Sequence, residues 1–450
     1  MPDNRSMMLH PSEPLALLVA GEGGWALPRH DTDEAPAIRQ LVRERYGLDA
    51  SLLGTAGGRY LDAERDEATA VFALEVHGVP GTLPPGARWI GRADLARLPL
   101  VDEGQRPIIE QWLREREDGA TPPKRVAWAR PGWLDTAAVW ICAELDRLGY
   151  MSIGPIEQVR IRPWSAVLRI TTGAGAVYFK AVTPSAAFEV PLTQALAGML
   201  PAQTPNVLAA DTERHWLLMA DAGTSLAPAL RAGGDPAPYA AALGEFARYQ
   251  LATVPYVGRL VALGCPDRRL ERLPALFART VADRDTLLVG RIGGFSESDY
   301  ARLRAMTPEV ERLCARLASY HMPTAALHHD EITPGHVIPA HDGGYIFFDW
   351  GDCGVTHPLC SLMMVLRWAR LVSRYDDQAL ASLRDAYLAP WAAYEPLERA
   401  REAYALAGRL ALLCRALTWY DLIPTMEPGA RWEFDDSAAY FLGLFANGED

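Results

Sequence analysis

Residues 327–359 read LHHDEITPGHVIPAHDGGYIFFDWGDCGVTHPL. This stretch is rich in β-forming residues and interrupts a C-terminal half whose pattern is otherwise mainly helical. Histidines and carboxylates gather near its start, where short strands and turns bring side chains together. Asp349 comes later, directly after the apolar run 345–348. The pattern predicts a loop-held base and a separate carboxylate that binds a cation.

Phosphoryl transfer needs this combination of groups. The protein contributes a lysine on the phosphates, a carboxylate for Mg²⁺ and a residue that orients the attacking hydroxyl. Lys180 ends the strand-like run 176–180 and is one of only two lysines among 44 basic residues. A compact ammonium that reaches between phosphates is not freely replaced by a planar guanidinium. Lys180 is therefore the candidate for the phosphate contact.

The residues around this loop resemble those of the aminoglycoside phosphotransferase and choline kinase-like family, relatives of the protein kinases. The resemblance spans about residues 131–366, with weaker helical similarity beyond. The loop of that family is H-x-D-x-x-x-x-N, followed by a strand and D-W. A gapless alignment places His329 on the His, Glu331 on the catalytic Asp and His336 on the Asn, while Asp349 falls on the metal-binding Asp.

The resemblance also implies a nucleotide site. Lys180 stands on the strand that carries the phosphate-pairing lysine, and Glu189 stands on its helix partner. The hairpin that covers the phosphates falls at 162–167, which includes Ser165 but no glycine. The hinge that binds adenine falls at 216–221, which includes Met219 and Asp221. ATP with Mg²⁺, or with Mn²⁺, is the implied cofactor, and a small hydroxylated molecule is the implied acceptor.

Two residues depart from the family pattern at the most chemical positions. Glu331 keeps the carboxylate but adds a methylene, and a displacement of about 1 Å at a reacting centre can cost about a hundredfold in rate. Asp330 is the alternative base, although adjacent residues in an extended loop point in opposite directions. The imidazole of His336 suits Mn²⁺ or Zn²⁺ better than Mg²⁺. The alternative to a kinase is therefore an inactive, kinase-like sensor or scaffold.

A zinc site is a further interpretation of the same residues. His328, His329 and His336 lie near Asp330 and Glu331, but their spacing matches no hydrolase signature such as H-E-x-x-H. Closely spaced neighbours cannot all face one ion. Asp352 either supports the metal or caps the following turn.

About residues 12–115 resemble a Nudix hydrolase fold. The matching segments are Trp25–Pro28, the helix that ends in Arg43–Leu48, and the strands 69–76 and 87–90. Of the glutamates that the Nudix helix presents to metal ions, only Glu44 remains. One carboxylate cannot assemble such a metal cluster. We therefore expect a Nudix-like α/β/α domain that has lost hydrolysis; active diphosphate hydrolysis is a third hypothesis.

The expected architecture is α+β, with a Nudix-like domain followed by a bilobal protein kinase-like fold. Charges, Gly119 and the pair Pro122–Pro123 mark a linker after a helical segment. The expected segments are 1–118 for the first domain, 119–130 for the linker, 131–225 for the N-lobe and 226–450 for the C-lobe, with the catalytic loop at 327–352.

Composition limits the partners. The 44 basic and 56 acidic residues give a net charge of −12, which argues against nucleic acid because phosphate binding needs clustered cations. The sequence contains no run of ~18 apolar residues, so it predicts no membrane span. Six scattered cysteines fit reduced thiols and a cytoplasmic location. The oligomeric state stays open.

The acceptor site of the family lies among the C-terminal helices. These segments carry arginines as readily as acids, which weakens the case for a polycationic antibiotic. The members of the candidate wall are Trp368, Arg370, Trp419, Tyr420 and Asp421, with Arg367, Arg374 and Arg415 in the same segments. Core packing is the alternative explanation of the aromatic residues.

Overall fold

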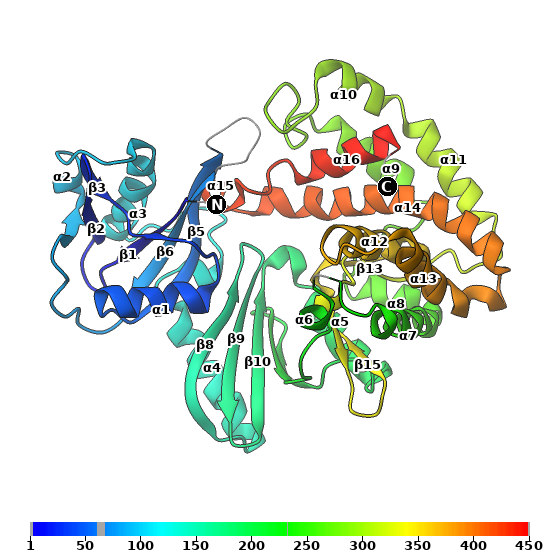
Figure 1. Ribbon diagram of the computed structural model, residues 1–450, viewed down its shortest axis with the longest axis horizontal. Helices are drawn as coiled ribbons and strands as arrows, with labels where there is room; N and C mark the ends of the chain where they lie inside the picture. The colour runs from blue at the N-terminus through cyan, green and yellow to red at the C-terminus, as the bar shows by residue number, and fades with distance from the viewer. Residues whose placement is uncertain (1–2, 61–67, 232, 449–450) are drawn as a thin grey trace. The chain divides into compact units, whose positions relative to one another are not determined.

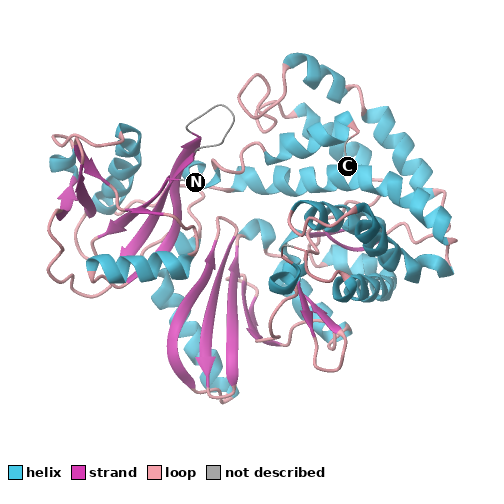
Figure 2. Cartoon of the chain, in the orientation of Figure 1, coloured by secondary structure: helices cyan, strands magenta, loops and turns pink. Residues whose placement is uncertain are grey.

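The computed structural model describes residues 3–60, 68–231 and 233–448 of the chain (Figures 1 and 2). These residues form two compact units. The first contains the chain up to Thr183 together with Thr425–Phe434, and the second contains Pro184–Pro424 and the C-terminal residues from Asp435. The four segments expected from the sequence follow a different division and stay a prediction.

The first unit begins with a mixed sheet in the order β3-β2-β1-β6-β5, in which β4 also pairs with β1 and β7 with β2. The pair β1–β6 is parallel, and the other pairs of this sheet are antiparallel. The strands are β1 (Asp3–Leu9), β2 (Leu15–Gly21), β3 (Gly24–Ala26), β4 (Arg29–His30), β5 (Ala50–Tyr60), β6 (Ala68–Val76) and β7 (Ala87–Gly91).

Helices pack on this sheet against every second residue of its strands. Helix α3 (Arg106–Asp118) contributes Ile109, Trp112 and Leu113 to a buried cluster with Met7 and Val71. Side chains alternate across a strand, so the neighbouring residues of β1 and β6 face the other way. Helix α1 (Ala35–Tyr46) packs against β5, and the short α2 (Arg92–Leu95) precedes α3. The N-terminal domain is thus a helix-covered mixed sheet.

Strand β5 was not expected from the sequence, because glycines disfavour strands. Its glycines allow close approach of other segments. A Cβ on Gly57 would lie 2.7 Å from Ile108, and one on Gly58 would lie 2.1 Å from the ring of Trp432. The strand also carries two register shifts against β6. The sequence pattern does not predict strand β1, because the polar residues Asn4 and Ser6 interrupt its apolar residues. Both polar side chains are buried.

A three-stranded antiparallel meander completes the first unit. The apolar residues at helical spacing between Leu134 and Leu148 predict a helix that Gly149 ends in the left-handed conformation. Helix α4 (Trp133–Leu148) agrees with this prediction, and the φ of Gly149 is 74°. It is followed by β8 (Ser152–Ile161), β9 (Ser165–Thr172) and β10 (Gly175–Val182). The sequence also predicts strands at 158–161, 167–170 and 176–180, and all three lie within these bounds. Helix α15 (Pro428–Arg431) returns to this unit from the C-terminal part of the chain.

The second unit is mainly helical. It opens with α5 (Glu189–Met199) and the hairpin of β11 (Val207–Asp211) and β12 (Trp216–Ala220). Its further helices are α6 (Ala227–Leu230), α7 (Ala237–Thr253), α8 (Val257–Ala262), α9 (Leu273–Ala282), α10 (Glu297–Arg304), α11 (Thr307–Ala318), α12 (Leu362–Leu371), α13 (Asp377–Leu388), α14 (Leu397–Leu422) and α16 (Ser437–Asn447).

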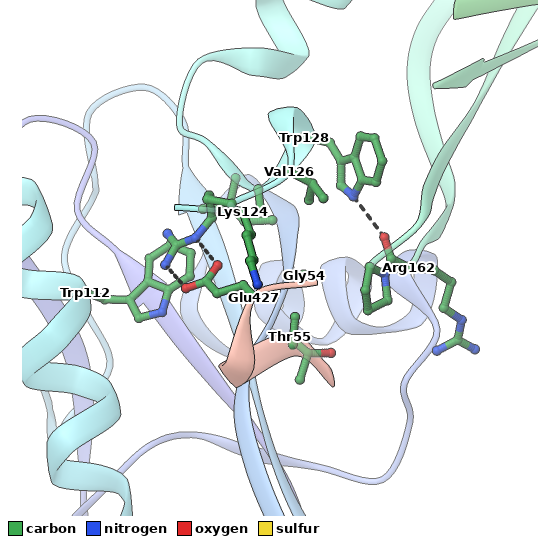
Figure 3. A pocket seen from close by; sticks show the side chains of 13 residues that line it. Gly54, Thr55, Trp112, Lys124, Val126, Trp128, Arg162 and Glu427 are labelled. Carbon is green, nitrogen blue, oxygen red and sulfur yellow. Dashed lines mark hydrogen bonds and ion pairs between the residues drawn. The ribbon is translucent and has the colours of Figure 1, made fainter. Parts of the chain in front are cut away.

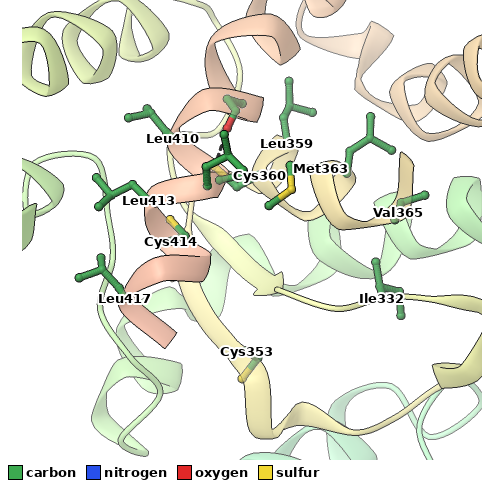
Figure 4. Packing of buried hydrophobic residues seen from close by; sticks show 14 of the residues in the cluster. Ile332, Cys353, Leu359, Cys360, Met363, Val365, Leu410, Leu413, Cys414 and Leu417 are labelled. Atoms are coloured by element: carbon green, nitrogen blue, oxygen red, sulfur yellow. Dashed lines mark hydrogen bonds between the residues drawn. The ribbon is translucent and has the colours of Figure 1, made fainter. Parts of the chain in front are cut away.

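Helix α14 (Leu397–Leu422) lies in the core of this unit. Buried residues cover it on all sides over its second half, which is typical of a helix inside a large core. Figure 4 shows Leu410, Leu413, Cys414 and Leu417 of this helix beside Leu359 and its neighbours. Burying one such leucine side chain stabilises a fold by about 1.5–3 kcal/mol.

Two small antiparallel pairs carry the loop of residues 327–359. Strand β13 (Ala326–His329) pairs with β16 (Cys353–Thr356), and β14 (Val337–Pro339) pairs with β15 (Tyr345–Phe347). The sequence predicts a β-rich island at 335–350, and the strands β13 and β16 extend it on both sides. No helix among the described residues is long and apolar enough to cross a membrane.

His357 makes folding sensitive to acid. Its side chain is fully buried, and its Nε2 is without a hydrogen-bond partner. Burial lowers the pKa of His357 from 6.5 to about 3. Because the folded pKa lies below the unfolded one, this stability is complete above pH 6.5 and is lost as the pH falls toward 3.

We predict that the free energy of unfolding falls more steeply below pH 6.5 in the wild type than in His357→Asn. Asn keeps an acceptor for the Leu359 N–H, which His357 Nδ1 accepts at 3.4 Å. At pH 5 the difference attributable to protonation is about 2 kcal/mol. Urea titrations of both proteins between pH 5 and 8 measure it, and parallel pH curves would contradict the assignment.

Candidate active site

The pairing of β13 with β16 brings two parts of the loop side by side. His329 lies opposite Cys353 in the register, and the Asp330 N–H donates to the carbonyl of Asp352 at 3.3 Å. The segment that carries Glu331 therefore lies against the segment that follows Asp349.

Asp330 points into the protein. Its side chain is 1% exposed, and it accepts hydrogen bonds from His328 Nε2 at 3.2 Å and from Thr418 Oγ1 at 2.7 Å. Burial alone would raise the pKa of Asp330, but His328 and the charge of Arg415 hold it well below its ordinary value. Asp330 is an ionised, buried anchor, and this geometry favours Glu331 over Asp330 as the residue that meets an acceptor.

Arg415 joins three carboxylates from inside the protein. It projects from α14, and its side chain is 6% exposed. Its Nη1 lies 2.9 Å from Asp352 Oδ2 and 3.6 Å from Asp330 Oδ2, and its Nη2 lies 3.1 Å from Glu331 Oε2. Burial opposes the charge, yet the three carboxylates raise the pKa of Arg415 above its ordinary value. A buried guanidinium of this kind is stable only with such partners.

The Glu331 side chain is partly exposed, and its surroundings disfavour the ionised form of its carboxyl group. About one third of its side chain is exposed, while one carboxylate oxygen contacts Arg415. Burial, followed by the charges of Asp352 and Asp349, raises the pKa of Glu331, although Arg415 and His336 oppose the rise. A raised carboxyl pKa is common in groups that exchange protons with a substrate.

His329 and His336 differ in their surroundings and in the direction of their pKa shifts. His329 Nδ1 accepts the Glu331 N–H at 3.2 Å, and its Nε2–H donates to the carbonyl of Phe348 at 3.1 Å. Burial and the neighbouring His336 lower the pKa of His329 to about 4, so its ring is neutral. His329 therefore fixes the turn that presents Glu331.

His336 bridges the loop to Asp349. Its Nδ1 contacts the carbonyl of Glu331 at 2.7 Å, and its Nε2 contacts Asp349 Oδ2 at 3.2 Å. Both partners only accept hydrogen bonds, so both ring nitrogens donate. Burial alone would lower the pKa of His336, but Asp349 raises it to about 9. In this arrangement His336 offers no lone pair to a metal, and a role as ligand would require its contact with Asp349 to open.

Asp349 combines an unusual backbone conformation with a partly exposed carboxylate. Its φ of 69° places a non-glycine residue in the left-handed region, a form of strain that concentrates at functional sites. Its side chain is about one-third exposed. Mg²⁺ bound with phosphates takes one or two carboxylates from the protein. Among residues 3–60, 68–231 and 233–448, no group of three His, Cys, Asp or Glu side chains is arranged to hold a metal. The donor set fits a metal shared with phosphates better than the zinc site considered above.

A family model described as "Phosphotransferase enzyme family" matches residues 158–398, which is more than half of the chain. The chain belongs to this phosphotransferase family. No curated protein matches the sequence. The residues that the family model matches include the loop that carries Glu331 and Asp349.

Several solved structures resemble the chain at low identity. Macrolide 2'-phosphotransferase MphH from Brachybacterium faecium is 17% identical, with a TM-score of 0.44, and the match covers 67% of this chain and 97% of that one. Choline kinase LicA from Streptococcus pneumoniae is 12% identical, with a TM-score of 0.43, and the match covers 68% and 99%. A choline/ethanolamine kinase family protein from Mesorhizobium loti is 14% identical, with a TM-score of 0.42, and the match covers 70% and 98%.

The residues expected on the nucleotide lie in both units. In the first unit, Ser165 begins β9 and Lys180 lies near the end of β10, and both are buried. In the second unit, Met219 lies on β12, and the exposed Asp221 accepts the N–H of Gly223 at 2.9 Å. The roles of these residues stay predictions.

Glu189 is packed against the loop that follows Asp349. It is the first residue of α5 and is 2% exposed. A Cβ added to Gly351 would lie 2.9 Å from its Oε2. An acidic residue in the first turn of a helix is favoured by the helix dipole. Helix α5 is therefore in direct contact with the loop that follows Asp349.

Most charges of the expected acceptor wall are already paired. Arg370 pairs with Asp377 at 3.2 Å, and Asp421 contacts Arg279 at 3.2 Å. The indole of Trp419 lies 5.3 Å from Arg415. The wall therefore offers aromatic surface more than free charge.

Arg415 is the functional residue whose role sequence reasoning missed. It was considered only as one of several cations in the acceptor wall. The available signal was its position in the run Leu410–Leu417, where an arginine interrupts leucine, alanine and cysteine. A charge inside an all-apolar helical face indicates a buried partner.

We predict that Arg415→Met destabilises the protein by about 3–5 kcal/mol, because Asp330 and its neighbours lose their buried counter-charge. The matched control is Arg409→Met on the same helix. Arg409 pairs with Glu309 at 2.9 Å but is 28% exposed, so its loss should cost at most about 1 kcal/mol. Urea unfolding at pH 7 measures both changes. Equal losses would contradict the central role of Arg415.

Proposed function

We propose that the protein is an ATP-dependent phosphotransferase that moves the γ-phosphoryl group of ATP to a hydroxyl of a small molecule. The observation that carries this proposal is the accessible carboxylate of Glu331, held by Arg415 on the family's catalytic loop. Asp349 on the same loop supports the proposal, because its negative charge helps to raise the pKa of the Glu331 carboxyl group.

Glu331 orients the acceptor in this mechanism. Its Oε2 is engaged by Arg415, which leaves Oε1 to accept a hydrogen bond from the acceptor hydroxyl. As the hydroxyl oxygen bonds to the γ-phosphorus, the bond from that phosphorus to the β–γ bridging oxygen breaks. The hydroxyl proton passes to Glu331, and ADP leaves. The raised pKa of Glu331 suits it to receive this proton.

Lys180 would bind the phosphates of ATP, and Asp349 would bind the metal ion that accompanies them. Phosphoryl transfer depends on positioning and charge more than on covalent chemistry by the protein. Mg²⁺, or Mn²⁺, bound by Asp349 would neutralise charge that develops on the phosphates. Lys180, with Glu189 as its helix partner, would bind the α- and β-phosphates, while Ser165 and the hinge residues Met219 and Asp221 would contact the rest of the nucleotide.

The charges around Glu331 are compatible with a cationic acceptor. Arg415 contacts Asp330, Glu331 and Asp352, and His336 contacts Asp349, so two cations face four carboxylates. The excess of negative charge attracts a cationic ligand, although the internal ion pairs reduce that attraction. Small alcohols, sugars and amino-alcohols remain the acceptor classes.

The second candidate function is an inactive kinase-like sensor or scaffold. The contact of His336 with Asp349 favours it, because a protonated imidazole stands where the family has an asparagine. The first domain, residues 1–118, fits this role as a non-hydrolytic Nudix-like module. Its helix α1 carries one carboxylate, Glu44, which accepts a hydrogen bond from Gln40 at 2.8 Å.

We also propose the following domain boundaries. The linker is 119–130, the N-lobe 131–225 and the C-lobe 226–450, with the catalytic loop at 327–352.

The net charge of −12 argues against nucleic-acid partners. Five of the six free cysteines are buried, which is compatible with a cytoplasmic protein.

We predict that ATP binds in the micromolar range only when Mg²⁺ or Mn²⁺ is present. Lys180→Met and Asp349→Asn should each weaken binding at least about tenfold, because each removes a charged contact worth about 1.5–3 kcal/mol. The matched controls are Lys124→Met, which changes the other lysine, and Asp342→Asn on an exposed turn. Calorimetric titration with EDTA, Mg²⁺ or Mn²⁺ measures the affinities. Absence of binding under all three conditions would contradict the proposal.

A further inference from the structure

The turn between β8 and β9, residues Arg162–Ser165, is stiff by its own sequence. It reads Arg-Pro-Trp-Ser, and the proline fixes one backbone angle. The Arg162 N–H donates to the carbonyl of Ser165 at 2.8 Å and closes the turn. The family places its phosphate-covering hairpin here. A turn without glycine cannot adapt its backbone freely to a ligand.

The linker after the N-terminal domain holds this turn from one side. Trp128 is 3% exposed, and its Nε1–H donates to the carbonyl of Arg162 at 2.9 Å. Figure 3 shows the indole directed at that carbonyl. The guanidinium of Arg162 also lies 3.1 Å from Asp33, but that pair is largely exposed and contributes little. Trp128 is therefore the principal contact on this side.

The C-terminal segment Thr425–Phe434 holds the turn from another side. The ring of Phe434 meets that of Trp164 edge to face, with centroids 5.0 Å apart. Aromatic pairs of this geometry stabilise beyond their buried area. The segment is thus in direct contact with the residue at the tip of the turn.

The same segment is fastened to the N-terminal domain. Glu427 pairs with the buried Arg125, with Oε1 and Nη2 2.7 Å apart, and Arg125 stacks 3.8 Å above the ring of Trp112. A Cβ on Gly429 would lie 2.3 Å from the carbonyl of Ala56, so the segment lies directly on β5. The position of Phe434 is therefore fixed by the N-terminal domain.

Strand β8, which leads into the turn, is also fixed. The buried side chain of Gln158 accepts the Leu52 N–H at 2.7 Å and donates to the Leu52 carbonyl at 2.8 Å. Gln158 thus gives β5 the two hydrogen bonds that a neighbouring strand would give. A buried amide with both bonds satisfied holds its surroundings rigidly.

We propose that the N-terminal domain acts as a rigid support for nucleotide binding, with Trp128 and Phe434 as positioning residues that hold the turn Arg162–Ser165 in its phosphate-binding form. This inference rests on the proposed ATP-dependent function. A preformed turn binds phosphates without the entropic cost of ordering a flexible loop. It explains how a hairpin without glycines serves this role, and it gives the first domain a function that needs no hydrolysis.

The test compares ligands that differ only in their phosphates. Calorimetric affinities for adenosine, ADP and ATP with Mg²⁺ are measured for the full chain, for Trp128→Phe, for Phe434→Leu and for the double variant. Phe434 is only half-buried, so Phe434→Leu keeps the fold even if Trp128→Phe does not. The matched control is Trp89→Phe, which changes an indole of the same unit that packs on His10 instead of the turn.

We expect the double variant to bind ATP about tenfold and ADP several-fold more weakly, while its affinity for adenosine stays within about twofold of the wild type. Trp89→Phe should leave all three affinities unchanged. Unchanged ATP binding in the variants, or equal losses for adenosine and ATP, would overturn the positioning role while leaving the kinase proposal intact. Failure of the wild type to bind ATP would overturn both.

Discussion

The buried guanidinium of Arg415 is the constraint on which the rest of the site depends. Its one positive charge is shared by the buried Asp330 and the partly exposed Asp352 and Glu331. Such an ion cluster is stable only when every member has a partner, and removing one leaves charges in a medium that solvates them poorly. Helix α14 must therefore lie where it does, and its leucines fill the core around it. Packing of the helical unit and placement of the Glu331 carboxylate are thus set together.

The sequence predicted the parts of the fold that depend on local pattern. Helix α4 with its Gly149 cap follows from helical periodicity and an end signal, and the strands around Lys180 follow from strand-like runs. The loop that carries Glu331 could be singled out because its residue spacing resembles that of a known family. Family membership then followed from the family model over residues 158–398.

The remaining features depend on distant contacts that no local pattern records. The glycines of β5 look like loop residues until Trp432 and Ile108 are seen to need the space. The role of Arg415 depends on its contact with Glu331, which lies 84 positions away in the sequence. The protonated state of His336 follows from two acceptors on its two ring nitrogens, which no alignment to an asparagine reveals. Segment Thr425–Phe434 joins the first unit although it follows the longest helix of the second.

The central claim is that Glu331 supports phosphoryl transfer despite its extra methylene. The most direct measurement is ADP formation from Mg²⁺-ATP in the presence of hydroxylated small molecules, compared between the wild type and Glu331→Gln at equal nucleotide occupancy. The account predicts acceptor-dependent ADP formation that falls by about two orders of magnitude or more in Glu331→Gln, because the base is lost while ATP binding is kept. Equal turnover in the two proteins, or bound ATP with no transfer to any acceptor, would contradict the account and leave the sensor or scaffold as the function.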